Sequence, residues 1–288
     1  MEKLIDLHTH STCSDGSMTP RELVEHAKAS GIAAIALSDH DGIAGVAEAV
    51  NAGRELGVEV IPAIELSVIS DTETHILGYF IDPESPAMDE AMQKIFAARQ
   101  FRASETCRLL NEIGFPVTMA EVEAVAGGSL LCRAHYARLL MDKGLVPSVK
   151  EAFDKYLANG RPAYCGKQAI TAEEAIDLIH KAGGIAFVAH LHLIRLSDEE
   201  LYAFLERLKA AGLDGIEGYY TEYTPEMQEK FQDMAKKLDL MISGGTDFHA
   251  AMKPHISIGR GLGEMAIPYS VLENLKIYYK NKKEGTRK

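Results

Sequence analysis

Short apolar runs alternate with longer amphipathic stretches along most of the chain. Each apolar run has the length of a buried strand, and each amphipathic stretch has the apolar spacing of a helix. We expect strands near residues 4–7, 33–37, 58–63, 74–79, 185–189, 215–219 and 240–243. We expect helices near residues 19–30, 43–56, 172–182, 197–211 and 225–238. Alternation of this kind predicts an α/β fold, a distorted (β/α)7-type barrel with parallel strands.

One long stretch interrupts this alternation. Residues 82–163 contain helical patterns at 88–113, 119–125 and 134–141 and no convincing strand. Asp82-Pro83 and Arg161-Pro162 are plausible borders, because proline disfavours continuation of regular structure. We therefore predict a helical insertion domain over 82–163, lodged in a barrel domain formed by 1–81 and 164–288.

Composition narrows the possible partners. The formal net charge of −12 argues against binding of extended duplex DNA, which requires a basic face. The four cysteines are widely spaced and predict reduced thiols rather than a disulfide framework. Neither a signal-peptide pattern nor a long apolar run is visible, so we expect a cytoplasmic protein without a membrane contact. The basic segment 280–288 is expected to be a solvated end.

Ligand-type side chains gather at the predicted strand ends. Parallel barrel strands present their carboxyl ends on one face, so residues far apart in sequence meet there. His8 and His10 alternate after the first strand and can therefore point the same way. The others in or after predicted strands are Asp39, His40, Glu65, His75, His190, Asp247 and His249.

Each of these motifs alone has an ordinary explanation as a polar surface residue or a hydrogen-bonded core histidine. The joint placement at successive strand ends is what favours metal binding. Imidazole with carboxylate suits manganese, zinc or iron, so the residues predict that this group of side chains binds metal.

The ordered motifs resemble those of the PHP (polymerase and histidinol phosphatase) superfamily over nearly the whole chain. They are His8-Thr9-His10, Asp15-Gly16, Ser38-Asp39-His40, Glu65, His75, Ala189-His190 and Gly245-Thr246-Asp247-Phe248-His249. Three further segments are similar to the TrpH-like phosphoesterase branch: Cys132-Arg133-Ala134-His135, Gly160-Arg161-Pro162-Ala163-Tyr164 and Gly215-Ile216-Glu217-Gly218-Tyr219-Tyr220. That branch includes enzymes that remove the 3′-phosphate from nucleoside 3′,5′-bisphosphates and enzymes that trim short RNA from its 5′ end.

The resemblance implies three metal positions. His8, His10, Glu65 and Asp247 would surround the first ion; Glu65, His75 and His190 the second; and Asp15, His40 and His249 the third. Three divalent ions against three carboxylates would leave a net charge of about +3, which attracts phosphate even in an acidic protein. The implied reaction is hydrolysis of a phosphate monoester by a metal-bridging hydroxide held by Glu65 and the metals.

The same resemblance suggests residues that bind a small phosphorylated substrate, a nucleotide or a short 5′-phosphorylated oligonucleotide. Arg133 is expected to act in binding and catalysis, because guanidinium grips phosphate bidentately. Further candidates are His135, Arg161, Lys167 and Tyr219. Tyr220 and Tyr223 could stack on a base or simply pack in the core.

Some positions depart from the family pattern. Leu191-His192 stands where proline usually follows His190, and Ala250 stands where glycine usually follows His249. None of the departures removes a predicted ligand. Three alternatives remain: a histidinol-phosphate phosphatase, a catalytically silent metal-binding module, and a metal-dependent amide hydrolase on a similar barrel.

Overall fold

The computed structural model describes residues 3–127, 131–166 and 170–285. The chain divides into two compact units. We call Met1–Val68, Thr72–Met92 and Thr171–Lys288 the barrel unit, and Ile69–Asp71 with Gln93–Ile170 the helical unit. That residues 82–163 form an insertion domain remains a prediction.

The barrel unit is built on an eight-stranded sheet in the order β7-β6-β5-β4-β3-β2-β1-β8. The strands are β1 (Leu4–Thr9), β2 (Ile32–Leu37), β3 (Glu59–Ser67), β4 (His75–Tyr79), β5 (Ile185–Val188), β6 (Gly215–Tyr220), β7 (Met241–Gly245) and β8 (Ile267–Pro268). The sheet nearly closes, because Thr9 bridges Phe248 just beyond β7 and His10 N donates to Phe248 O at 2.9 Å. The predicted α/β barrel is confirmed.

Two strands differ from the parallel expectation: the short β8, which pairs antiparallel with β1, and β4. β4 runs antiparallel to both β3 and β5, whereas β1/β2, β2/β3, β5/β6 and β6/β7 are parallel. The connection from Ser67 to His75 is too short for the helical crossover that a parallel partner requires. β4 therefore returns as a hairpin.

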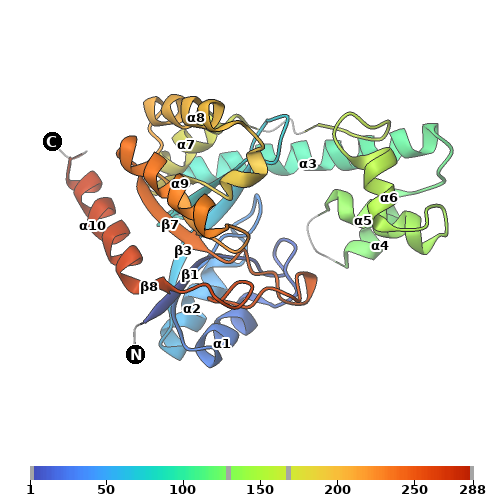
Figure 1. The fold of residues 1–288 in the computed structure, drawn as a ribbon. Helices are drawn as coiled ribbons and strands as arrows, with labels where there is room; N and C mark the ends of the chain where they lie inside the picture. Colours follow the sequence, from blue (N-terminus) through green and yellow to red (C-terminus); the bar gives the residue numbers. More distant parts are fainter. Residues whose placement is uncertain (1–2, 128–130, 167–169, 286–288) are drawn as a thin grey trace. The chain divides into compact units, whose positions relative to one another are not determined.

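Helices of the barrel unit surround this sheet (Figure 1). They are α1 (Pro20–Ala29), α2 (Val46–Leu56), α7 (Ala172–Lys181), α8 (Asp198–Ala210), α9 (Pro225–Lys237) and α10 (Tyr269–Gly285), with short 3-10 turns η2 (Leu191–Ile194) and η3 (Ala250–Met252). Helix α1 begins at a capping box: the Thr19 side chain accepts from Glu22 N, and the Glu22 carboxylate accepts from Thr19 N.

Helix α10 and strand β8 were not predicted. Leu272 and Leu275 of α10 are fully buried and pack with barrel residues such as Ile5, Leu77 and Phe187. The basic segment at 280–285 is thus the end of a helix that closes one side of the barrel core. None of the described helices is both long and apolar enough to cross a membrane.

The helical unit has its own core. It contains most of α3 (Pro86–Glu112), together with α4 (Met119–Ala126), α5 (Arg133–Asp142), α6 (Val149–Ala152) and the π-helix η1 (Phe153–Leu157). Leu110, Val122, Tyr136 and Leu140 are buried together. The helices predicted at 88–113, 119–125 and 134–141 are confirmed to within two residues at each end.

Candidate metal centre

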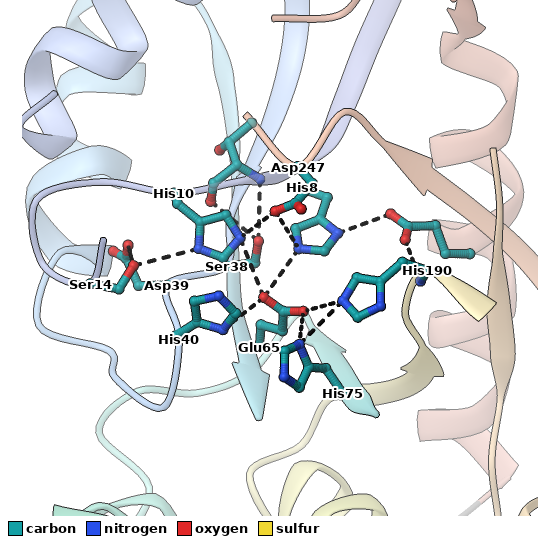
Figure 2. A network of polar contacts seen from close by, with 12 residues as sticks. His8, His10, Ser14, Ser38, Asp39, His40, Glu65, His75, His190 and Asp247 are labelled. Carbon is teal, nitrogen blue, oxygen red and sulfur yellow. Dashed lines mark hydrogen bonds and ion pairs between the residues drawn. The ribbon is translucent and has the colours of Figure 1, made fainter. Parts of the chain in front are cut away.

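Polar side chains converge at one rim of the barrel (Figure 2). β1 supplies His8 and leads to His10, β2 leads to His40, and β3 carries Glu65. His75 is the first residue of β4, so the antiparallel direction of this strand brings its amino end to the same rim. His190 follows β5, and Asp247 and His249 follow β7.

The first group consists of His8, His10, Glu65 and Asp247, all of them buried. Glu65 Oε2 lies 3.2 Å from His8 Nε2 and 3.3 Å from His10 Nε2. Asp247 Oδ1 lies 3.5 Å from His8 Nε2 and 3.1 Å from His10 Nε2. Four ligands about 2.1 Å from a zinc-sized ion in a tetrahedron lie about 3.4 Å apart, so the spacing suits one ion at their centre.

The second group uses the other oxygen of Glu65. Oε1 lies 2.8 Å from His75 Nδ1 and 3.0 Å from His190 Nε2, and the two ring nitrogens are 3.2 Å apart. Glu65 therefore presents one oxygen to each of two neighbouring groups. A carboxylate in this position can bridge two cations.

The third group, Asp15, His40 and His249, is looser and more exposed. His249 Nε2 lies 3.1 Å from Asp15 Oδ1, and His40 Nε2 lies 3.8 Å from Asp15 Oδ2. His40 also turns Nδ1 towards Glu65 Oε2 at 3.0 Å, which the sequence did not predict. His40 thus connects the third group to the first (Figure 2).

Several ligand atoms are buried without a hydrogen bond. Within the described part of the chain these include His8 Nε2, His10 Nε2, His40 Nδ1 and Glu65 Oε2. Buried polar atoms of this kind are costly unless something satisfies them. A divalent cation would do so, and the nitrogen and oxygen donors suit zinc, manganese or iron.

The local electrostatics keep the carboxylates ionised. Burial alone would raise the pKa of Glu65, but His40, His8 and His75 hold that pKa well below its usual value. The pKa of Asp247 is also held well below normal, since the charges of His8, His249 and Lys253, together with a polar contact from His10, outweigh its burial. Burial lowers the pKa of His10 to about 3, so this ring is neutral and able to act as a ligand.

Carboxylates behind the cluster fix its loops. Asp39 accepts hydrogen bonds from Ser11 N at 2.8 Å and Ser14 Oγ at 2.6 Å, which orders the loop that carries Asp15. Asp6 accepts from Thr246 N at 2.8 Å, directly before Asp247. Burial raises the pKa of Asp6 to about 6 in spite of its hydrogen bonds.

Sequence reasoning assigned no role at the cluster to three residues that contact it. Glu217 lies 3.0 Å from His8 Nδ1. The buried Tyr220 donates to Asp247 Oδ2 at 3.0 Å, and Lys253 donates to the same oxygen at 2.6 Å. Glu217 and Tyr220 stand in a recognised motif, whereas no sequence pattern pointed to Lys253.

The predicted substrate-binding residues are divided between the two compact units. Arg133 and His135 belong to α5 of the helical unit, where Arg133 Nη1 donates to Leu157 O at 3.2 Å and His135 Nδ1 accepts from Cys132 N at 3.1 Å. Arg161 is an exposed residue of the same unit. Tyr219 packs against the barrel core, and Lys167 lies outside the described residues.

Comparison with known proteins agrees with a barrel hydrolase that acts on phosphoesters. The chain is 38% identical over 250 residues to a 5′-3′ exoribonuclease of Haemophilus influenzae, with 86% of this chain and 91% of that protein covered. It is 34% identical over 248 residues to a 3′,5′-nucleoside bisphosphate phosphatase of Chromobacterium violaceum, with 85% and 87% covered. A structure from Bifidobacterium adolescentis, described as a metal-dependent phosphoesterase, has a TM-score of 0.81 at 29% identity and 96% coverage of both chains.

The PHP domain family matches residues 6–225. The chain belongs to this family, and the predicted phosphoesterase class is confirmed.

Proposed function

We propose that this enzyme hydrolyses the phosphoester at the 3′ oxygen of a nucleotide that also carries a 5′-phosphate. In a nucleoside 3′,5′-bisphosphate the reacting group is a terminal phosphate. In a short 5′-phosphorylated oligonucleotide the reacting phosphate links the first nucleotide to the next. In both substrates the bond between the 3′ oxygen and phosphorus would be cut. The observation that carries the proposal is the Glu65-centred cluster, whose donor spacing suits cations that bind phosphate. The names of the two relatives supply the substrate class.

We further propose that the three groups hold two or three ions of manganese, zinc or iron. Glu65 is placed to bridge the first two positions, and Asp15, His40 and His249 would form the third. Bound ions would polarise the phosphoryl oxygens and lower the pKa of a water towards neutrality. Such ions would outweigh the negative charge of Asp15, Glu65 and Asp247 and would make the rim attractive to anions in an acidic chain.

The chain's own cations are proposed to recognise phosphate beyond the metals. The Arg133 guanidinium lies 5.4 Å from the Tyr164 ring centre and 5.9 Å from that of Phe153. Together with its bond to Leu157 O, these contacts hold the group in one orientation, which favours bidentate binding. Four residues remain proposed contacts of lower rank: His135, Arg161, Lys167 and Tyr219. Residues 82–163 are proposed as the insertion domain that carries Arg133, His135 and Arg161.

A substrate panel tests this function. Metal-loaded enzyme should release phosphate from adenosine 3′,5′-bisphosphate and shorten 5′-phosphorylated RNA faster than it acts on adenosine 3′-monophosphate or 5′-hydroxyl RNA. Histidinol phosphate and an amide substrate test the two rival enzymes. Asp247→Asn is the matched inactive control, because it removes one ligand charge at nearly constant shape. Equal rates with and without the 5′-phosphate would contradict the proposed specificity.

A further inference from the structure

Glu217 is a fully buried carboxylate of β6 that touches two of the ligand groups at once. Its Oε1 lies 3.0 Å from His8 Nδ1, on the side of the ring that faces away from the first group. Its Oε2 accepts a hydrogen bond from the backbone N of His190 at 2.7 Å. One side chain thus contacts a ring of the first group and the backbone that carries a ring of the second.

The backbone at His190 needs this support. His190 has φ 27° and ψ 63°, in the left-handed region that a residue with a Cβ rarely adopts. Its side chain nevertheless reaches Glu65 Oε1 at 3.0 Å. The bond from His190 N to Glu217 helps to hold the peptide in this conformation, and so directs the ring to the cluster.

We propose that Glu217 is a positioning residue that selects the metal-binding tautomer of His8 and holds His190 in place, so that the first two metal positions are coupled. This inference rests on the proposed metal centre. A carboxylate can only accept hydrogen bonds, so His8 Nδ1 must carry the proton. Nε2, which faces Glu65 and Asp247, then keeps its lone pair for an ion. A carboxylate behind a ligating histidine commonly fixes the ring in this way.

Glutamine at position 217 would reverse the tautomer although it has nearly the same shape. The backbone N of His190 always donates, so it would claim the amide oxygen. The amide NH2 would then face His8 Nδ1, which would have to accept. The proton of the neutral ring would move to Nε2, and His8 could not bind an ion there. Aspartate is shorter but still only accepts, so it preserves the tautomer at the cost of a looser contact.

The ranking of two variants tests this inference. Metal affinity is measured by competition with a chelator and metal content by elemental analysis, with circular dichroism to verify folding. Wild type should bind metal most tightly and Glu217→Asp less tightly. Glu217→Gln should bind metal most weakly, with an affinity about tenfold or more below that of wild type. If Glu217 serves only to fill space, glutamine should bind at least as well as aspartate, and that order would overturn the proposal. Wild-type protein that binds no metal would overturn the metal centre itself, and this proposal with it.

A measurement on the wild-type protein keeps the test independent of variant folding. In zinc-loaded protein with 15N-labelled histidine, long-range proton–nitrogen correlation spectra distinguish the two tautomers of each ring. His8, assigned by loss of its signals in His8→Gln, should carry its proton on Nδ1 and none on Nε2. A proton on Nε2 of His8 would refute the assignment of Glu217.

Discussion

The ammonium of Lys253 donates a hydrogen bond to Asp247 Oδ2 at 2.6 Å, while Oδ1 of the same carboxylate lies 3.1 Å from His10 Nε2. Tyr220 donates to Oδ2 as well, at 3.0 Å. One oxygen of Asp247 is therefore kept for the cluster, and the other is held by two donors. Burial works against the charge of Lys253, but Asp247 outweighs it and raises the pKa of the ammonium, so Lys253 is positive at neutral pH.

Replacement of Lys253 should weaken catalysis more than folding. Lys253→Met removes a charge-assisted hydrogen bond, an interaction of about 1.5–3 kcal/mol. If the ammonium also helps to neutralise a phosphoryl group, kcat/KM should fall roughly ten- to a hundredfold. Steady-state kinetics on adenosine 3′,5′-bisphosphate and elemental analysis would separate this loss from a loss of metal.

Lys230→Met is the matched control for this experiment. Lys230 makes a bond of the same length, 2.6 Å, to Asp198, but on the exposed surface of the barrel unit. Such exposed pairs contribute little, so its kinetics should match wild type. Equal kinetics for Lys253→Met and Lys230→Met would refute a role for Lys253 at the centre.

The rim of the barrel was predictable because strand ends can be located from the sequence alone. His8, Glu65 and Asp247 stand in or directly after apolar runs, and parallel strands bring such positions together. Glu217 and Lys253 were not assigned roles at the cluster, because their positions relative to the ligands cannot be located from strand ends. Their function depends on which atoms face which across the barrel, and no local pattern encodes a contact such as that between residues 8 and 217.

Parts of the fold escaped prediction for different reasons. The direction of β4 was implicit in the short connection after Ser67, which leaves no room for a crossover helix. Helix α10 was not predicted because its sequence lacks a clear apolar pattern. Lysines and tyrosines surround the two leucines that it buries, Leu272 and Leu275. Only the tertiary structure shows that those leucines complete the barrel core.

Arg133 is expected to act on substrate and not on metal. Arg133→Ala should leave the metal content unchanged and lower kcat/KM for phosphorylated substrates roughly ten- to a hundredfold, because one charge-assisted contact is lost. Arg138→Ala is the matched control: it lies on the same helix, α5, and pairs with Asp142 on the surface at 2.9 Å. Comparison of kcat/KM for adenosine 3′,5′-bisphosphate and for adenosine 3′-monophosphate shows which phosphate Arg133 contacts. A loss confined to the bisphosphate identifies the 5′-phosphate, and unchanged kinetics on both would exclude the role.

A methyl group at Gly245 should disturb the first metal position. A Cβ built there would lie 2.3 Å from both N and Cβ of His8, so β1 and β7 would have to move apart. Overpacking of this kind costs about 1–3 kcal/mol, and here it displaces a ligand. Gly245→Ala should therefore lower both the melting temperature and the metal affinity. Gly42→Ala is the control, because its Cβ would meet only His40 O at 3.6 Å and should change neither quantity. Normal metal affinity in Gly245→Ala would contradict the packing argument.

Asp214 is a buried carboxylate outside the metal-ligand groups, and it connects α10 to the barrel. It accepts hydrogen bonds from Tyr278 OH at 2.8 Å and Ala186 N at 2.9 Å, lies 2.7 Å from His180 Nε2 and also pairs with Lys282. Burial alone would raise the pKa of Asp214, but its bonds with His180, Lys282 and Ala186 N outweigh burial and lower it. The ionised form of Asp214 therefore stabilises the folded protein.

This linkage predicts how stability changes with pH. The pKa of Asp214 in the folded protein is below its value of about 4 in the unfolded chain. The contribution of Asp214 to the free energy of unfolding is therefore complete above pH of about 4 and is lost as pH falls through the folded pKa. Asp214→Asn should lower the free energy of unfolding by about 1.5–3 kcal/mol at pH 7 and by less at pH 3. Denaturant unfolding of metal-free protein at both pH values measures the difference without interference from ligand protonation. Asp177→Asn, which breaks an exposed pair with Lys181, should change stability by less than about 0.5 kcal/mol at either pH. An equal loss at pH 7 and pH 3 for Asp214→Asn would show that shape and not charge joins α10 to the barrel.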